Sequence, residues 1–330
     1  MAFVADGSQW CFDGWHPQEI VDGFEKLLER VSVARDRNET VWIGDDLQTR
    51  HVLGALDLWS LFSPIAPIQL PAEIGQELAA WLGRAPHYAD EKEWPDGLTD
   101  ALIRVDDDAE VQNDDLAWAH HWVRAGRAVA CLCLTQSGPH TTVSRQGVAT
   151  VHWIQSEADH RAFWRSAVDV EGDNQETLER LAPHAFPDLY FHINVWRGVG
   201  RFGGGYAAVR GQLRRYLSVL DDHGCWAFTH PPPALHPGEP VLPAAGRPSN
   251  QVIERRFHGF NLDMAPENPD VHSDGTCRRA REIELADRTL YCEWHGKLER
   301  HRNRIYIHEP VPEAGGKVVI AFFHEHLPLP

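Results

Sequence analysis

The sequence lacks any hydrophobic run long enough to cross a bilayer. Its longest apolar stretches, 128–134 and 318–323, have the length of single strands, whereas a membrane-spanning helix needs about 20 apolar residues. The first ten residues contain no basic segment and include Asp6, which is not the pattern of a secretory signal. We therefore expect a cytoplasmic protein that does not bind a membrane.

Cysteine is also sparse: the chain has six, and they are scattered. Cys131 and Cys133 alternate within one apolar run, and nothing pairs with them at the spacing of a zinc site. Buried thiols in a reducing compartment are therefore the expected state of these two residues. No cofactor is predicted.

Basic residues are outnumbered by acidic ones, 31 to 48, which gives a net charge of −17. Such a balance argues against a protein that coats nucleic acid through charge alone. The excess is uneven, because residues 1–250 carry a net −15 and residues 251–330 a net −2. Within 275–308, eight basic residues accompany five acidic ones. The sequence thus predicts an acidic body with one mildly basic segment.

The length of 330 residues exceeds the usual range of one domain, so two domains are expected. Seven prolines fall within 230–250, a composition that favours a semi-rigid linker over a helix or a strand. We accordingly predict an acidic domain over 1–229, a linker over 230–250 and a small β-meander domain over 251–330. The acidic domain would regulate or recruit the C-terminal one.

Hydrophobic periodicity predicts an α+β protein with helices and antiparallel strands. Ser156 and Asp159 have the spacing of a capping box, at the start of a helix that runs to about Val168. An antiparallel meander is expected in the N-terminal domain, at 128–134, 141–144 and 148–154. Further helices are expected at 16–31, 47–62, 73–82, 116–125, 175–182, 207–220 and 278–285.

A glycine cluster in the middle of the chain matches the pattern G-x-G-x-x-G, with Gly198, Gly200 and Gly203. No acidic residue ends a second strand and no alternating βαβ pattern surrounds it, so close packing against a neighbouring backbone is predicted instead of dinucleotide binding. The following helix carries three arginines that could bind an anion, although a solvated helix face also explains them. These are Arg210, Arg214 and Arg215.

The C-terminal meander is predicted to gather polar side chains on one face. Its strands are expected at 289–298, 304–308 and 317–326. Because side chains alternate along a strand, the apolar residues of these segments share one face and the polar residues share the other. The candidate catalytic residues on the polar face are Glu293, His295, Lys297, Arg304, Tyr306 and His308.

These residue types suit the cleavage of a phosphodiester without a metal ion. Glu293 or a neutral histidine can accept the proton of a ribose 2′-hydroxyl, and histidine has a pKa close to the operating pH. Lys297 and Arg304 can stabilise the charge that develops on the phosphate. A second histidine or Tyr306 can protonate the leaving oxygen. A half-exposed sheet with a merely polar outer face explains the same pattern about equally well.

A metal site is the weaker alternative. Glu293 and His295 form one co-facial pair, and His324 and His326 form another, so together they could supply four ligands. The strand register decides which face His324 and His326 occupy, and the sequence does not reveal it.

The segment 280–330 resembles the RelE-type mRNA interferase toxins. The resemblance rests on the runs RTLYCEWHGKL, NRIYIHE and KVVIAFFHEHL, which are similar to the strands of that family's β-meander. It implies a concave sheet face around a scissile phosphate, with Lys297, Arg304 and Tyr306 in phosphate-contacting or catalytic roles. By the same resemblance His295 is a candidate acid or base.

The leading hypothesis is a bacterial toxin-like or antiviral-defence effector whose C-terminal domain is a metal-independent endoribonuclease that binds RNA. An inhibitory or recruiting partner would bind the N-terminal domain. The alternative is a non-catalytic assembly subunit, in which the polar sheet face binds another protein. A metal-dependent hydrolase is the third hypothesis.

Overall fold

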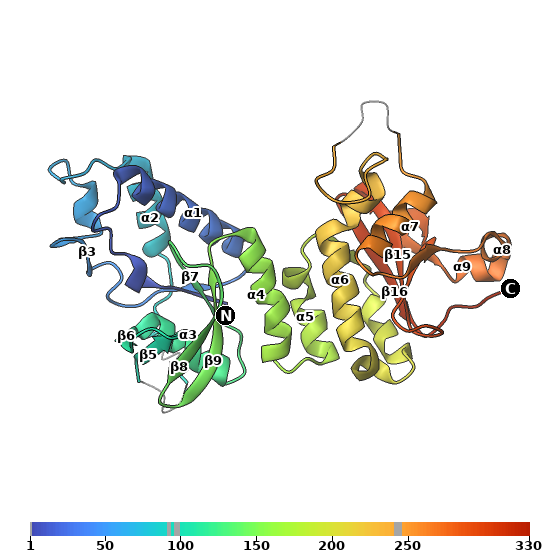
Figure 1. Cartoon of the computed structure of the whole chain (residues 1–330), viewed down its shortest axis with the longest axis horizontal. Coiled ribbons are helices and arrows are strands. Elements are labelled where there is room, and N and C mark those ends of the chain that lie inside the picture. Colours follow the sequence, from blue (N-terminus) through green and yellow to red (C-terminus); the bar gives the residue numbers. More distant parts are fainter. Residues whose placement is uncertain (1, 91–93, 96–99, 241–245) are drawn as a thin grey trace. The chain divides into compact units, whose positions relative to one another are not determined.

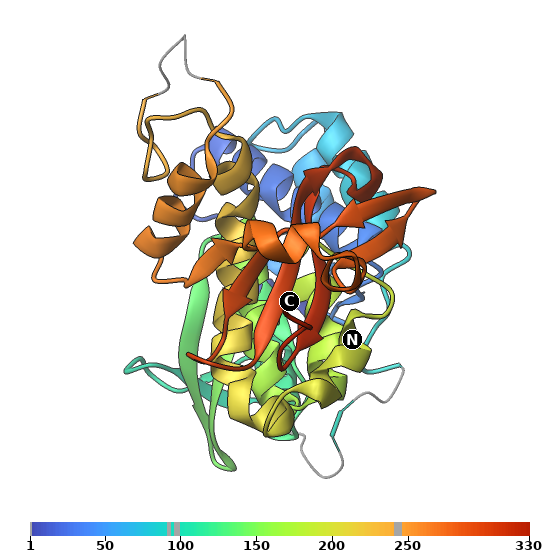
Figure 2. The same cartoon turned by 90° about the vertical axis from the view of Figure 1, so that its right-hand side faces the viewer.

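A computed structural model describes residues 2–90, 94–95, 100–240 and 246–330, which form two compact units. Unit 1 is Met1–Gly172 and unit 2 is Asp173–Pro330. Both units appear in Figure 1, and Figure 2 turns unit 2 towards the viewer. Each unit combines helices with a sheet, so the α+β class is confirmed. Across the described residues, no helix combines the length and apolar character that a membrane span requires.

The sheet of unit 1 has seven strands in the order β2-β1-β7-β9-β8-β5-β6. Strands β1, β2, β7 and β9 run parallel, whereas β8 and β5 are antiparallel to their neighbours. The expected meander over 128–154 therefore differs from the observed pairing, because β7 pairs with β9 in parallel and only β8–β9 is a hairpin. The strands are β1 (Phe3–Ala5), β2 (Val41–Trp42), β5 (Leu102–Val105), β6 (Val111–Gln112), β7 (Ala130–Leu132), β8 (Gly138–Ser144) and β9 (Gly147–Ile154).

In unit 1 the helices α1, α3 and α4 begin at side-chain caps, whereas α2 does not. In α4 (Glu157–Val170) the Ser156 hydroxyl accepts from the backbone of Asp159, whose side chain accepts from the backbone of Ser156, so the predicted capping box is confirmed. The capping residue of α1 is His16, followed by a proline at the first helical position. The helices are α1 (Pro17–Asp36), α2 (Ala72–Leu82), α3 (Asp114–Arg124) and α4.

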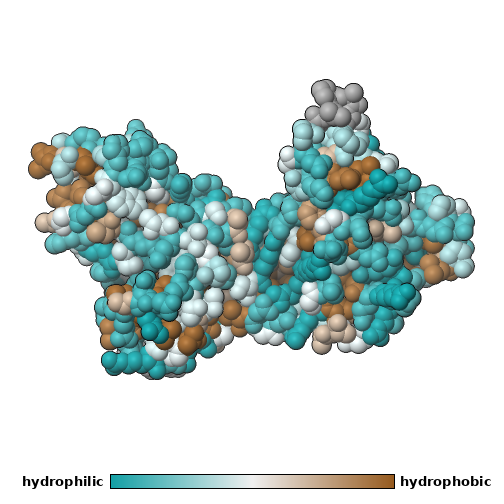
Figure 3. Space-filling view, in the orientation of Figure 1, coloured by the Kyte–Doolittle hydropathy of each residue, from teal (hydrophilic) through white to brown (hydrophobic). Residues whose placement is uncertain are grey.

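The predicted helix at 47–62 is wrong. The chain instead forms the hairpin β3 (His51–Leu53) and β4 (Leu56–Asp57), followed by a 3-10 turn at Trp59–Phe62. Gly54 adopts φ 55°, a left-handed conformation that allows the tight turn and interrupts any helix there. Residues 58–72 contain no charged residue and are exposed in part, with Ile65 92 % exposed. Figure 3 shows hydrophobic residues gathered in this region of unit 1, at the left edge.

Unit 2 begins well before the proline-rich segment, which corrects the predicted domain boundary. Strand β10 (Leu189–Phe191) pairs in parallel with β16 (Lys317–His324), so residues before and after 230–250 share one sheet. The start of the segment is also packed, because the buried guanidinium of Arg256 donates to the carbonyls of Ala234 and Pro231. Of the predicted linker, residues 241–245 lie outside the described residues.

The sheet of unit 2 has five strands in the order β10-β16-β15-β14-β11, antiparallel apart from β10. The predicted helix at 278–285 is instead the end of α9 and the strand β12, which forms a separate hairpin with β13. The remaining elements are α5 (Gln175–Ala185), α6 (Gly205–Thr229), α7 (Asn250–Gly259), β11 (Met264–Pro266), α8 (Pro269–Ser273), α9 (Gly275–Arg279), β12 (Glu282–Leu285), β13 (Arg288–Tyr291), β14 (Trp294–Lys297) and β15 (Arg304–Val311).

Both faces of this sheet are packed. On one face Trp294 contacts Phe228 of α6 and Phe257 of α7, with ring centroids 5.5 and 6.5 Å away. Figure 2 shows the long yellow helix α6 behind the orange and red strands. Part of the other face is covered by the β12–β13 hairpin, in a second apolar cluster. Its buried members are Ile283, Leu285, Leu290, Cys292, Val311, Ala314, Val319 and Ala321.

Candidate functional site on the C-terminal sheet

The strand register places two rows of predicted site residues side by side on the second face. Lys297 lies opposite Arg304, which lies opposite His324 on the next strand. Two residues earlier on β14, His295 lies opposite Tyr306 of β15. Four of the six predicted catalytic residues therefore lie in these two rows, and the register adds His324 to the first row.

The other two predicted residues do not join these rows. Glu293 precedes β14, and its Oε1 accepts a hydrogen bond from Nδ2 of Asn250 at 3.0 Å. His308 follows Tyr306 by two residues on β15 and lies opposite Val319, beyond the two rows, and its Nδ1 is 2.8 Å from the carbonyl oxygen of Glu309.

The face is not the open concavity that the sequence predicts. Tyr306 is fully buried, and its hydroxyl oxygen accepts from the backbone nitrogen of Leu327 at 3.1 Å. Nη1 of Arg281 donates to the carbonyl of Pro328 at 3.0 Å, and its guanidinium carbon lies 5.7 Å from the Tyr306 ring centre. Residues 325–328, here called the strap, therefore cover the hydroxyl end of Tyr306, and Arg281 lies over its ring. Burial raises the pKa of Tyr306 and keeps its hydroxyl protonated.

A carboxylate that the sequence pattern missed lies beside His295. Oε1 of Glu267 accepts from Nε of Arg281 at 2.8 Å and lies 3.4 Å from Nδ1 of His295. Burial alone would raise the pKa of Glu267, but the contacts with His295 and Arg281 lower it, so the carboxylate is ionised. Glu267 follows β11 in a proline-flanked segment without strand alternation, so no periodicity marked it as a partner of His295.

Arg304 is the least satisfied side chain of the face. Among the described residues, its Nε and Nη1 are buried and have no hydrogen-bond partner. On one side of it, Nζ of Lys297 lies 3.1 Å from Oδ1 of Asp263, in an exposed ion pair. On the other side, burial and then the charge of Arg201 lower the pKa of His324. Buried donors without partners are rare in folded proteins, so these two mark a place where an anion would be stabilised.

The alternative metal site is not formed. His295 and His324 belong to different rows of the sheet, with β15 between their strands. Nδ1 of His324 accepts from the backbone nitrogen of His326, and Nδ1 of His326 lies 2.7 Å from the carbonyl of Leu327. Within the ranges that the structure describes, no three His, Cys, Asp or Glu side chains are placed to hold a metal ion.

The predicted anion-binding arginines on α6 have protein partners. Arg210 and Arg214 each lie 3.4 Å from the carboxylate of Asp173, and Arg215 donates to the carbonyl of Phe260. The glycine cluster packs as expected, because a Cβ on Gly198 would lie 2.1 Å from the carbonyl oxygen of Phe323. Neither feature adds to the candidate site.

The chain was compared with known proteins at three levels. No protein-family description, no curated protein and no solved structure matches it. Any function therefore has to be inferred from the site itself.

Proposed function

We propose that unit 2 is a metal-independent endoribonuclease, of the toxin-like or antiviral-effector kind, which binds an RNA phosphate on the row Lys297–Arg304–His324. The single observation that supports this most directly is the pair of partnerless donors on Arg304, directly opposite Lys297. A guanidinium with free N–H groups beside an ammonium matches the two charged oxygens of a phosphodiester.

His295 is the group suited to proton transfer in this proposal. It lies two residues before Lys297 on β14, on the same face of the strand. Its Nδ1 lies 3.4 Å from the ionised carboxylate of Glu267, and this negative charge favours a proton on Nδ1. Nε2 is then free to accept the proton of a ribose 2′-hydroxyl. The 2′ oxygen bonds to phosphorus, the bond to the 5′ oxygen breaks, and the leaving oxygen takes a proton from solvent. Lys297 and Arg304 stabilise the added negative charge.

Binding requires the strap to move, since it covers Tyr306 and contacts Arg281. In this proposal Tyr306 positions the strap through Leu327 and does not transfer a proton. Glu293 and His308, which lie off the two rows, have no role in cleavage.

The test is cleavage of a 5′-labelled single-stranded RNA by the full chain in the presence of EDTA. His295→Gln should lower the rate by about 10²-fold or more, the usual contribution of a general base. Arg304→Ala should lower it by about 10- to 10²-fold, as expected for the loss of a charge-stabilising donor. His301→Gln and Arg302→Ala are matched controls, because both residues are exposed in the adjacent turn. Undiminished cleavage by the first two variants would refute the proposal.

A second candidate function is that of an assembly subunit, which the exposed apolar segment of unit 1 favours. Residues 58–72 contain no charged residue, and Trp59 and Ile65 are exposed large hydrophobics. Such a surface is typical of a protein–protein contact. The substitution Ile65→Lys should then abolish a co-purifying complex while leaving RNA cleavage unchanged, which separates the two functions.

A further inference from the structure

Unit 1 contains a pocket that the proposed nuclease does not use. Its volume is about 530 Å³, and it lies between the last turns of α1, the end of α2 and the start of β2. Apolar side chains form most of its wall, with Val31 from α1, Trp81 from α2 and Val41 from β2. Both the size and the apolar wall are typical of sites for small molecules.

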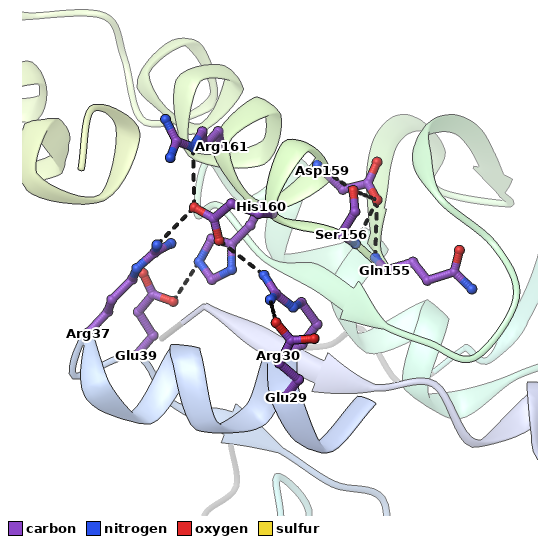
Figure 4. Close-up of polar contacts among 10 residues, drawn as sticks. Glu29, Arg30, Arg37, Glu39, Gln155, Ser156, Asp159, His160 and Arg161 are labelled. Carbon is purple, nitrogen blue, oxygen red and sulfur yellow. Dashed lines mark hydrogen bonds and ion pairs between the residues drawn. The ribbon is translucent and has the colours of Figure 1, made fainter. Parts of the chain in front are cut away.

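The floor of the pocket is held in place by a buried polar pair. Glu39 lines the pocket and joins α1 to β2, and its carboxylate lies 2.8 Å from Nε2 of His160 on α4. Figure 4 shows the side chain of Glu39 turned to His160. Because this side chain is only 1 % exposed and is turned to His160, it offers a ligand no direct contact. The mouth of the pocket is therefore not formed by the Glu39 carboxylate.

Two arginines line the mouth. Arg35 is in the last turn of α1 and Arg84 lies two residues beyond the end of α2, and both are exposed. Their setting is unusual, since unit 1 has 28 acidic and 13 basic residues, a net of −15. Both arginines lie at the C-terminal ends of helices, where the helix dipole favours a basic residue. The two helix ends bring both guanidiniums to one apolar pocket, where Glu77 is the only exposed carboxylate among the described lining residues.

We propose that this pocket binds a small amphipathic anion, with an apolar or aromatic body against Trp81 and Val31 and one anionic group between Arg35 and Arg84. Contact with Trp81 buries the apolar body, and the two guanidiniums pair with a carboxylate, sulfonate or phosphate. The site belongs to unit 1 and is independent of the nuclease proposal.

The experiment uses two fluorescent probes with the same ring system and different charge, on the full chain. 8-Anilinonaphthalene-1-sulfonate carries an anion, whereas N-phenyl-1-naphthylamine is neutral. The sulfonate should bind with a stoichiometry of one, and the double variant Arg35→Glu/Arg84→Glu should weaken it by about tenfold, the value of one charge-assisted contact. Binding of the neutral probe should change little. Ala80→Trp, at an exposed helix position of the wall, should block both probes.

A second charge reversal separates the local effect from the change in net charge. Arg104→Glu/Arg145→Glu changes the net charge of unit 1 by the same amount as Arg35→Glu/Arg84→Glu, but at residues that line a different pocket. This control should bind the sulfonate like the unaltered chain, and circular dichroism should show that all variants are folded. The proposal is overturned if both double variants weaken the sulfonate equally, or if folded Ala80→Trp binds both probes unchanged.

Discussion

Nε2 of His160 lies 2.8 Å from Oε2 of Glu39, and the two side chains are 0 % and 1 % exposed. The pair links α4 to the turn between α1 and β2, as Figure 4 shows. A buried polar group that loses its partner keeps its desolvation cost, so His160→Leu should lower the free energy of unfolding by about 2–3 kcal/mol. Urea denaturation followed by circular dichroism measures this change.

The partly exposed pair of His140 and Asp106, at 2.7 Å, is the control for that prediction. His140→Leu should cost less than about 1 kcal/mol, because solvent replaces the lost contact. The double variant Glu39→Leu/His160→Leu should be less destabilised than the sum of its single variants. Strict additivity would contradict the coupling that the geometry implies.

A second prediction concerns Asp115, which is buried at the start of α3. Burial and then the charge of Asp6 raise its pKa from 3.8 to about 7, against hydrogen bonds from Gly7 and Tyr88 that lower it. Between about pH 4 and pH 7 the folded state retains a proton that the unfolded state loses. Stability therefore falls as the pH rises through this range, and the effect is absent below about pH 4.

Asp115→Asn should remove this dependence. The amide oxygen can accept from the backbone nitrogen of Gly7, and the amide nitrogen can donate to the hydroxyl of Tyr88. The variant should match the unaltered chain near pH 4 and exceed its stability by roughly 2–4 kcal/mol at pH 7. The control variant is Asp114→Asn, which changes the exposed neighbouring aspartate. A constant difference across this pH range would contradict the prediction.

The sequence predicted helices and strands well where neighbouring residues along the chain determine them. The capping box of Ser156 and Asp159 marked the start of α4, and alternation located β15. The single strand predicted at 289–298 is divided in the structure between β13 and β14, which belong to different sheets. The helix predicted at 47–62 failed because its apolar spacing fits a helix, whereas the left-handed Gly54 allows a hairpin. The parallel pairing of β7 with β9 depends on contacts between distant segments, which no local pattern encodes.

The sequence predicted which side chains share the face of the candidate site, but it did not predict which groups surround them. Alternation placed His295, Lys297, Arg304 and Tyr306 together correctly, because period two is a property of each strand. The cover over Tyr306 comes from the strap, whose position follows from tertiary packing. Glu267 was missed for the same reason, since it reaches His295 from outside the predicted strands.

A third prediction concerns the strap and rests on the proposed nuclease. Leu327 is 6 % exposed and Leu329 is 58 % exposed, so only the former contributes buried apolar surface. Leu327→Ser should loosen the strap by about 1–2 kcal/mol and raise the rate of RNA cleavage by about tenfold. Leu329→Ser should leave the rate unchanged. Equal rates for the two variants, with hydrogen exchange confirming that the strap of Leu327→Ser is open, would show that the strap does not limit access.

The last prediction tests the close approach of Gly198 to β16. A Cβ at Gly198 would lie 2.1 Å from the carbonyl oxygen of Phe323, whereas a Cβ at Gly200 would meet nothing within 4 Å. The obstructing atom belongs to the backbone of a buried strand and cannot move aside without disturbing the pairing with β15. Gly198→Ala should therefore destabilise unit 2 by about 1–3 kcal/mol or more, the usual cost of overpacking. Gly200→Ala should be neutral or slightly stabilising, because it only restricts the unfolded chain. Thermal unfolding of both variants measures this difference in stability. Equal melting temperatures would contradict the prediction and show that the turn accommodates a Cβ at Gly198 without loss of stability.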